Sequence, residues 1–393
     1  MIIGVPRDTQ DGERRVALIP ASIAELKKKG HDVLVEKDAG VAAGFPDKHF
    51  GDAGATVVDR SKVFADAQVI LEVNSFGANP DQGAADLANL NKDQTVIGFS
   101  DPLGNAEAAK QVAATGARSF SMELIPRITR AQSMDALSSM ATIAGYKSVL
   151  LGAEHLPRLF PMLMTAAGTL APARVFVIGV GVAGLQALAT AKRLGAVTSA
   201  YDVRPVVKEQ VQSVGAKFIE LDLETGDAEG SGGYAKAQGE EFLRKQRELM
   251  LKVVSENDVV ITTAAIPGRK APILVTSEMV HAMEPGSVVV DIAAERGGNC
   301  ELTKAGEVVD VNGVQIVGPL NLPSQIPYHA SQMYARNITT FLNHMVKEGE
   351  LTLDLEDEVV TATLVTNGGD VVHPMIREKL GMPAAEASIG SDN

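Results

Sequence analysis

The sequence is poor in the residues that cross-links, basic surfaces and membrane spans require. Its 393 residues include a single cysteine, no tryptophan and 4% aromatics. The lone Cys300 excludes an intramolecular disulfide and a cysteine-cluster metal site, and such usage is typical of a reducing compartment. A net charge of −13 argues against a nucleic-acid surface, which needs a basic footprint. Because no apolar run approaches about 18 residues and no apolar signal segment opens the sequence, we expect a cytoplasmic protein without its own membrane span.

One stretch in the middle of the chain predicts a dinucleotide site. Residues 174–178 form a β-branched, apolar strand pattern, and Gly179, Gly181 and Gly184 follow it with the spacing G-x-G-x-x-G. In that pattern the first glycine permits a tight turn, the second lets a pyrophosphate approach the backbone, and the third lets the next helix pack closely on the strand. The helix expected over residues 182–194 would offer its unpaired N–H groups and dipole to the phosphates.

A carboxylate follows at the end of the next predicted strand, residues 197–201. Asp202 lies at roughly the ~20-residue offset expected of the acid that binds a ribose 2′-hydroxyl. A negative charge there would repel a 2′-phosphate, so the sequence favours NAD(H) over NADP(H). Arg204 is the one opposing charge, and Pro205 is expected to open a helix directly after it. A strand at residues 258–262 should end beside the same cofactor.

Strand and helix patterns alternate along most of the chain, which predicts an α/β fold with two Rossmann-like domains, each a doubly wound parallel sheet, joined by long helices. We expect residues 1–130 with 325–381 to form the N-terminal domain, residues 131–324 the NAD(H)-binding domain, and residues 382–393 a flexible tail. Residues 131–154 are expected to form one long linking helix.

An acidic, glycine-rich segment at residues 221–239 interrupts the regular pattern. It is either a solvated loop or a lid that closes on the nucleotide with its one aromatic residue, Tyr234.

A second polar cluster is predicted where a strand passes into the long helix. Gln132 and Asp135 are three residues apart and would share the first helical turn, and Arg127 precedes them. They are either a helix cap with a solvated partner or a group that orients a nicotinamide ring. The sequence offers no nucleophile with an orienting partner and no histidines at metal-ligand spacing. A dinucleotide site without an evident general acid indicates direct hydride transfer, in which the protein positions the cofactor.

These stretches together resemble the NAD(H)-binding subunit of the proton-translocating nicotinamide nucleotide transhydrogenases. The likeness covers nearly the whole chain and is carried by the residues 4–7 and 13–17, the segment 126–140, the glycine pattern, and the stretches 202–212, 266–272, 291–300 and 322–324. The most specific of these is the segment with Arg127, Gln132 and Asp135, which in that family contacts the nicotinamide ring. The alanine dehydrogenases are similar in fold, but they use a lysine and a histidine where this chain has stretches around Asn74 and Asp101 that contain neither.

The resemblance implies reversible hydride transfer between NAD(H) on this chain and NADP(H) on a partner component, coupled to proton movement by a membrane-spanning component. It also implies a homodimer held peripherally at the inner face of a bacterial cytoplasmic membrane. An alanine-dehydrogenase-like enzyme and a non-catalytic NAD sensor are the alternatives. The residues expected at the cofactor are Gly179, Val180, Gly181, Val182, Ala183, Gly184, Asp202, Val203, Arg204, Tyr234, Thr263, Ala264 and Ala265.

Overall fold

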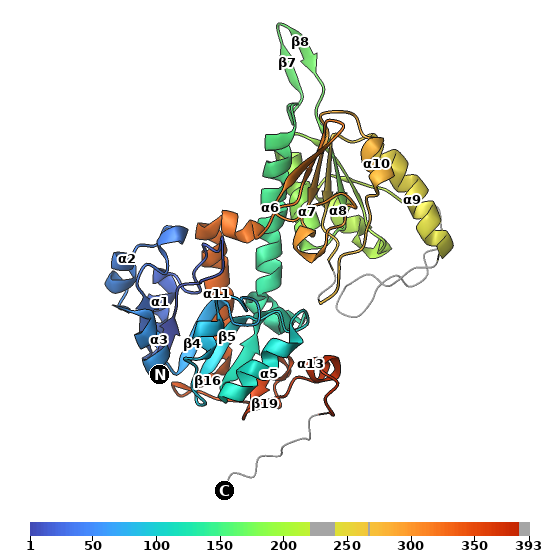
Figure 1. The fold of residues 1–393 in the computed structure, drawn as a ribbon. Coiled ribbons are helices and arrows are strands. Elements are labelled where there is room, and N and C mark those ends of the chain that lie inside the picture. Colours follow the sequence, from blue (N-terminus) through green and yellow to red (C-terminus); the bar gives the residue numbers. More distant parts are fainter. Residues whose placement is uncertain (221–239, 266–267, 385–393) are drawn as a thin grey trace. The chain divides into compact units, whose positions relative to one another are not determined.

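The computed structural model describes residues 1–220, 240–265 and 268–384, and it divides the chain into two compact units (Figure 1). The first unit comprises Met1–Met140 and Ser324–Asn393, and the second comprises Ala141–Pro323. The division falls within a helix rather than at residue 130. The predicted lid with Tyr234 lies outside the described residues, as does most of the predicted tail. Over the described part of the chain, no helix has the length and apolar character needed to cross a membrane.

The first unit is built on an eight-stranded sheet with the order β19-β18-β6-β5-β4-β1-β2-β3. All pairs from β6 to β3 are parallel, whereas β18 and β19 are antiparallel additions at one edge. Its strands are β1 (Ile2–Val5), β2 (Asp32–Glu36), β3 (Thr56–Val58), β4 (Val69–Asn74), β5 (Thr95–Phe99), β6 (Arg118–Ser121), β18 (Leu364–Asn367) and β19 (Asp370–Val371).

Helices cover both faces of this sheet. Its helices are α1 (Pro20–Lys28), α2 (Asp47–Asp52), α3 (Arg60–Asp66), α4 (Ala84–Leu87), α5 (Ala106–Thr115), α11 (Pro327–Met345), α12 (Glu358–Thr363) and α13 (Pro374–Lys379). On one face α11 packs its aromatic side chains against the strands, with ring centroids of Phe341 and Phe120 5.7 Å apart. On the other, Val63 and Phe64 of α3 form a buried cluster with Ile70 and Val96. Successive residues of a strand point to opposite faces, so both faces are apolar.

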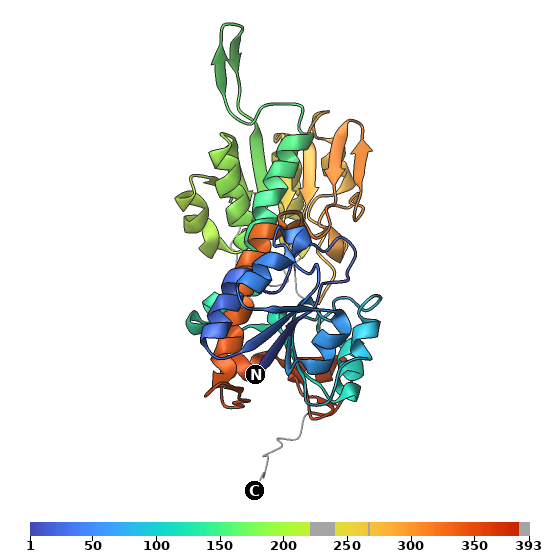
Figure 2. The same cartoon turned by 90° about the vertical axis from the view of Figure 1, so that its left-hand side faces the viewer.

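The second unit contains a seven-stranded sheet with the order β11-β10-β9-β12-β13-β15-β14. Every pair is parallel except β14 with β15. Its strands are β9 (Arg174–Ile178), β10 (Val197–Tyr201), β11 (Lys217–Phe218), β12 (Val259–Thr262), β13 (Val288–Asp291), β14 (Val308–Val311) and β15 (Val314–Val317). A separate hairpin of β7 (Leu163–Thr165) and β8 (Gly168–Leu170) extends away from the sheet (Figures 1 and 2).

Alternation along β9 divides the core of this unit between two helical layers. Val175 and Val177 pack with α7 (Val182–Arg193), α8 (Lys208–Ser213) and the part of α6 (Ala136–His155) that belongs to this unit. Phe176 and Ile178 pack on the opposite face with α9 (Glu240–Ser255) and α10 (Ser277–His281). The predicted class, two Rossmann-like sheets with helices on both faces, is confirmed.

Two details of the expected elements are wrong. The predicted helix over residues 131–154 is broken, because a 3₁₀ helix, η3 (Thr129–Met134), is followed by the non-helical Asp135 at ψ 88° before α6 begins. The parallel series also omitted the antiparallel strands at the edges. The small elements that complete the chain are η1 (Val41–Ala43), η2 (Met122–Leu124), η4 (Pro205–Val207), η6 (Ala294–Arg296), η7 (Leu322–Gln325), β16 (Val346–Lys347) and β17 (Glu350–Leu351).

Candidate functional site

The turn between β9 and α7 has the geometry of a phosphate-binding loop. Gly179 takes a φ of 95°, which side chains other than glycine rarely adopt. A Cβ on Gly184 would lie 2.0 Å from the Gly179 carbonyl oxygen, so only glycine lets α7 approach the strand this closely. A Cβ on Gly181, by contrast, would meet no atom within 4 Å, so the space in front of this residue is open. The three glycines therefore have the three separate roles that the spacing predicted.

The N-terminus of α7 is free of a side-chain cap. Gly181 is its N-cap residue, and the Gly181 carbonyl accepts the first helical bond from Leu185 N–H at 2.9 Å. Val182 is 40% exposed at the first helical position, beside Ala183. The first N–H groups of a helix have no partner within the helix, so they can donate to a phosphate that enters the open space at Gly181. The residues present therefore fit a dinucleotide pyrophosphate.

Asp202 lies at the end of β10 and joins the two strands that meet at this turn. Its Oδ2 accepts the Val180 N–H at 2.7 Å, and its Oδ1 accepts the Arg204 N–H at 2.9 Å. The Arg204 side chain donates from Nε to Oδ1 and from Nη2 to Oδ2, both at 2.9 Å. Nη2 also lies 3.2 Å from the Val180 carbonyl oxygen. Arg204 is therefore an ion-pair partner of Asp202, and its charge is largely neutralised there; Val203 between them packs on the core.

The loop after β12 closes the same edge of the sheet. Thr263 donates its N–H to the Ile178 carbonyl and its hydroxyl to the Gly179 carbonyl, both at 2.9 Å. Ala264 is held by Asn299, whose side chain accepts the Ala264 N–H at 3.0 Å and donates to its carbonyl at 2.8 Å. Ala265 follows and is exposed. The structure therefore brings residues 263–265 against the glycine turn.

Asn299 and Asp291 are functional-site residues that sequence reasoning missed. Asn299 is fully buried and fixes the loop after β12 through Ala264. Asp291, at the end of β13, is also fully buried and accepts hydrogen bonds from Asn299 N–H at 2.7 Å and Cys300 N–H at 2.9 Å. The position of an acid at the carboxyl end of a parallel strand was the available signal.

Two titratable groups near the turn are held uncharged. Burial, with a smaller contribution from Asp202, raises the pKa of Tyr201 to about 12, and Gln246 donates to its hydroxyl at 3.1 Å. Burial and then the charge of Asp291 raise the pKa of the Cys300 thiol to about 11. A buried thiol with a raised pKa is a poor nucleophile, which is consistent with a site that binds rather than forms covalent intermediates.

Arg127, Gln132 and Asp135 belong to the first unit, whereas the glycine turn belongs to the second. Asp135 accepts the Ser138 N–H at 2.8 Å and the Ser138 hydroxyl at 2.6 Å, so it caps α6. It does not share a helical turn with Gln132, because Gln132 lies in η3. Arg127 and Gln132 are exposed. Asp135 thus has a structural role of its own, and Gln132 keeps its amide at the surface.

The fold and the glycine turn define a Rossmann-like, nucleotide-binding class of protein. Comparison with known families makes this specific. The alanine dehydrogenase/PNT N-terminal domain family matches residues 4–144, and the alanine dehydrogenase/PNT C-terminal domain family matches residues 148–374. The chain belongs to the alanine dehydrogenase/PNT family.

Its relatives include transhydrogenase subunits at high identity. The chain is 46% identical over 380 residues, 96% of this chain and 99% of the relative, to an NAD(P) transhydrogenase subunit alpha chain of Rhodospirillum rubrum. It is similar to the crystal structure of a transhydrogenase from Sinorhizobium meliloti, with 47% identity and a TM-score of 0.84 over 95% of this chain and all of that chain. An L-alanine dehydrogenase structure is more distant, with 25% identity and a TM-score of 0.79 over 97% of this chain and 99% of that one.

Proposed function

We propose that this chain is the NAD(H)-binding component of a transhydrogenase and transfers hydride directly and reversibly between NAD(H) bound here and NADP(H) on a partner component. The observation that carries the proposal is the glycine turn of the second unit, with its open helix N-terminus and Asp202, in a chain whose similar relatives are transhydrogenase alpha subunits. The described residues present this fingerprint once, so the second nucleotide comes from another component.

Binding of NAD(H) follows from the groups at the turn. The N–H groups of Val182 and Ala183 would hold the pyrophosphate at the N-terminus of α7. Asp202 would accept hydrogen bonds from the ribose, because a carboxylate has about four acceptor positions and Arg204 does not exhaust them. The negative charge and the closed Arg204 pair both disfavour a 2′-phosphate. The domain of residues 131–324 is therefore assigned to NAD(H).

The nicotinamide supplies the hydride chemistry, and the protein supplies orientation. We assign the orienting role to Arg127 and Gln132, whose exposed side chains can donate to a carboxamide, with Asp135 fixing the start of α6 beside them. Direct transfer requires the reacting carbons within roughly 3–3.5 Å, so small displacements of such residues cost rate. Tyr234, outside the described residues, is proposed to close over the bound nucleotide. No acid–base step is assigned to these residues.

The partners follow from the same proposal. An NADP(H)-binding component receives the hydride, and a membrane-spanning component couples the transfer to proton translocation. The chain would then be held at the inner face of a bacterial cytoplasmic membrane through these partners.

A homodimer is part of the proposal and is supported by the projecting hairpin of β7 and β8. All of its residues are exposed, and Met164 is 79% and Leu170 48% exposed. Apolar side chains on an extended arm are costly in water and are typical of a surface that pairs with a second copy of the chain.

An alanine-dehydrogenase-like reaction is the second candidate, because the matching family includes those enzymes. The first unit does not favour it. Arg15 is closed on Glu13, with Nε–Oε1 at 2.8 Å and Nη2–Oε2 at 2.6 Å. Asn74, where those enzymes are expected to place a lysine, donates to Asp8 and Glu13 at 3.0 Å. A pocket lined by these carboxylates is unsuited to a 2-oxo acid.

The deciding experiment measures NADH oxidation by the chain in two mixtures. With NADP⁺ and membranes that supply the NADP(H)-binding component, the proposal requires reduction of NADP⁺ that neither component gives alone. With pyruvate and ammonium, it requires no oxidation by the chain alone. Pyruvate-dependent oxidation would establish the dehydrogenase. Tight NADH binding with neither activity would indicate a nucleotide sensor.

A further inference from the structure

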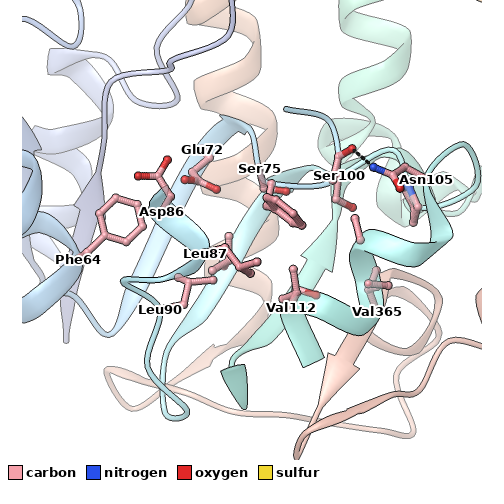
Figure 3. Close-up of a pocket in the computed structure, with 17 residues that line it drawn as sticks. Phe64, Glu72, Ser75, Asp86, Leu87, Leu90, Ser100, Asn105, Val112 and Val365 are labelled. Carbon is pink, nitrogen blue, oxygen red and sulfur yellow. Dashed lines mark hydrogen bonds between the residues drawn. The ribbon is translucent and has the colours of Figure 1, made fainter. Parts of the chain in front are cut away.

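A cavity in the first unit lies away from every residue assigned to nucleotide binding. It is formed on the sheet face covered by α3, α4 and α5 (Figure 3). The empty space is about 520 Å³, some of it open to solvent. Its lower wall is apolar and includes Leu87, Leu90, Val112 and Val365, whereas carboxyl and hydroxyl groups gather along its opposite side. A cavity with one apolar and one polar wall is the usual form of a small-molecule site.

Glu72 is the unusual residue of the polar wall. It follows Ile70 by two positions on β4, so it points to the same interior face of the sheet, and it is only 9% exposed. Among the residues that the structure describes, none donates a hydrogen bond to its carboxyl group, although its backbone carbonyl accepts the Tyr334 hydroxyl at 2.7 Å. A buried acid without a donor is costly unless something else in the cavity satisfies it.

A second polar group of the same wall is also unsatisfied. The Ser100 Oγ is buried and has no hydrogen-bond partner among the described residues. The other polar side chains there are engaged, since the Ser75 hydroxyl donates to the Phe99 carbonyl at 3.0 Å and Asn105 Nδ2 donates to the Gly77 carbonyl at 3.1 Å. Glu72 and Ser100 are therefore the two groups that the protein leaves for a ligand.

The charges around Glu72 select the sign of that ligand. Asp86 of α4 lies beside it in the cavity, and Asp8 faces it from the segment after β1. Arg60 is the opposing cation, but it is held by Asp86, with Nε–Oδ1 at 2.7 Å, and by Glu36, with Nη1–Oε2 at 2.6 Å. Burial first, then Asp86 and Asp8, raise the pKa of Glu72 to about 8, and Arg60 opposes the shift. The local excess of carboxylates favours a cation.

We propose that this cavity binds a small primary amine, whose ammonium group pairs with the Glu72 carboxylate and whose short apolar chain lies along Leu87, Leu90 and Val112. The Ser100 hydroxyl supplies a further hydrogen-bond acceptor on the polar wall. The proposal does not depend on hydride transfer, because none of these residues is assigned to the nucleotide site.

The pH dependence follows from the same pairing. An ammonium ligand requires ionised Glu72, so binding displaces a proton from the empty site and weakens as pH falls below about 8. Affinity should fall roughly tenfold for each further pH unit while the amine itself stays charged. Asp8, whose pKa is raised to about 6 mainly by burial and by Glu13, would add to the loss at lower pH. Arg15, Arg60 and Tyr334, the other groups around this acid cluster, keep their charge states over this range.

The test titrates the full-length chain calorimetrically with n-butylamine and with the neutral isostere butan-1-ol at pH 9 and pH 7. We expect saturable binding of the amine at pH 9, at least tenfold weaker binding at pH 7, and at least tenfold weaker binding of the alcohol at either pH. Glu72→Gln should abolish the preference for the amine and its pH dependence. Val112→Phe, which narrows the apolar wall, should weaken both probes.

Glu107→Gln is the matched control, because Glu107 is an exposed acid on α5 whose side chain pairs with Lys110. It should leave amine binding unchanged, and NADH binding should be unchanged in all three variants, which verifies their fold. The proposal is overturned if the two probes bind equally, if Glu72→Gln retains amine affinity, or if no amine binds at pH 9.

Discussion

Arg204 and Asp202 form a two-point ion pair at the edge of the nucleotide turn, with Nε–Oδ1 and Nη2–Oδ2 both at 2.9 Å. Their side chains are 14% and 6% exposed, so the pair is largely shielded from water. The same carboxylate accepts the Val180 N–H from the glycine turn. One acid therefore both shapes the turn and neutralises the cation beside it, which makes the pair the element that decides between the two nucleotides.

Asp202→Ala should weaken NADH binding and improve NADPH binding. Loss of hydrogen bonds to a charged group costs about 1–3 kcal/mol of NADH binding free energy. The freed Arg204 guanidinium would also attract a 2′-phosphate. Fluorescence titration with both nucleotides measures the change. The double variant with Arg204→Ala should lose the gained NADPH affinity; unaltered NADH affinity in the single variant would place the ribose elsewhere.

Gln132→Asn should slow hydride transfer at least tenfold while NADH affinity changes less than about twofold. Shortening an exposed amide by one methylene removes a contact that orients the ring but leaves the pyrophosphate and ribose contacts intact. Single-turnover transfer to the partner component, compared with equilibrium NADH titration, separates the two effects. Weaker binding with an unaltered transfer rate would contradict the orienting role.

Asp357 should make folding of the first unit pH-dependent. Burial acts to raise its pKa, but Arg130 at 2.7 Å, His344 and the backbone N–H groups of α12 together hold the pKa well below the usual value. A depressed pKa stabilises the folded state above the unfolded pKa of about 4, and the benefit is lost progressively as pH falls below it.

Asp357→Asn should therefore lower the free energy of unfolding by about 0.5–1 kcal/mol at pH 7, the range for a partly exposed ion pair, because the amide can still cap α12. Urea denaturation at pH 7 and pH 3 measures the difference, which should shrink at pH 3. An undiminished difference at pH 3 would show that the charge is not its source.

Met164→Asp should convert the proposed dimer to a monomer. A charge on the β7–β8 arm would have to be buried in any interface that this arm forms, at a cost of several kcal/mol. Sedimentation velocity gives the mass. Thr165→Asp on the same strand tests whether the effect is specific to the apolar side chain, and a Met164→Asp protein that remains dimeric would move the interface away from the hairpin.

Sequence reasoning succeeded where the controlling interactions are local. The glycine spacing, the strand before it and Asp202 after the next strand are close in the chain, and each is found in its expected place. Two hairpin signals were available but not used: Asn312-Gly313 between β14 and β15, where both residues have positive φ, and Gly368-Gly369 between β18 and β19. They would have predicted the antiparallel strands.

Other features depend on contacts between distant segments. Asn299 is a site residue only because it reaches Ala264, 35 positions earlier. Glu72 is recognisable as a buried acid only once α4 and α5 cover its face of the sheet. The break at Asp135 arises because its carboxylate caps α6 through Ser138 instead of continuing the helix, and the apolar periodicity on either side does not reveal it.

The most direct test of the central claim follows deuterium from NADH labelled at the transferred position. In a single turnover with NADP⁺ and the NADP(H)-binding component, the account predicts deuterium in NADPH, none in water, and a slower rate than with unlabelled NADH. The chain without that component should transfer none. Label released to water, or NADPH formed by this chain alone, would contradict direct transfer between nucleotides held on two components.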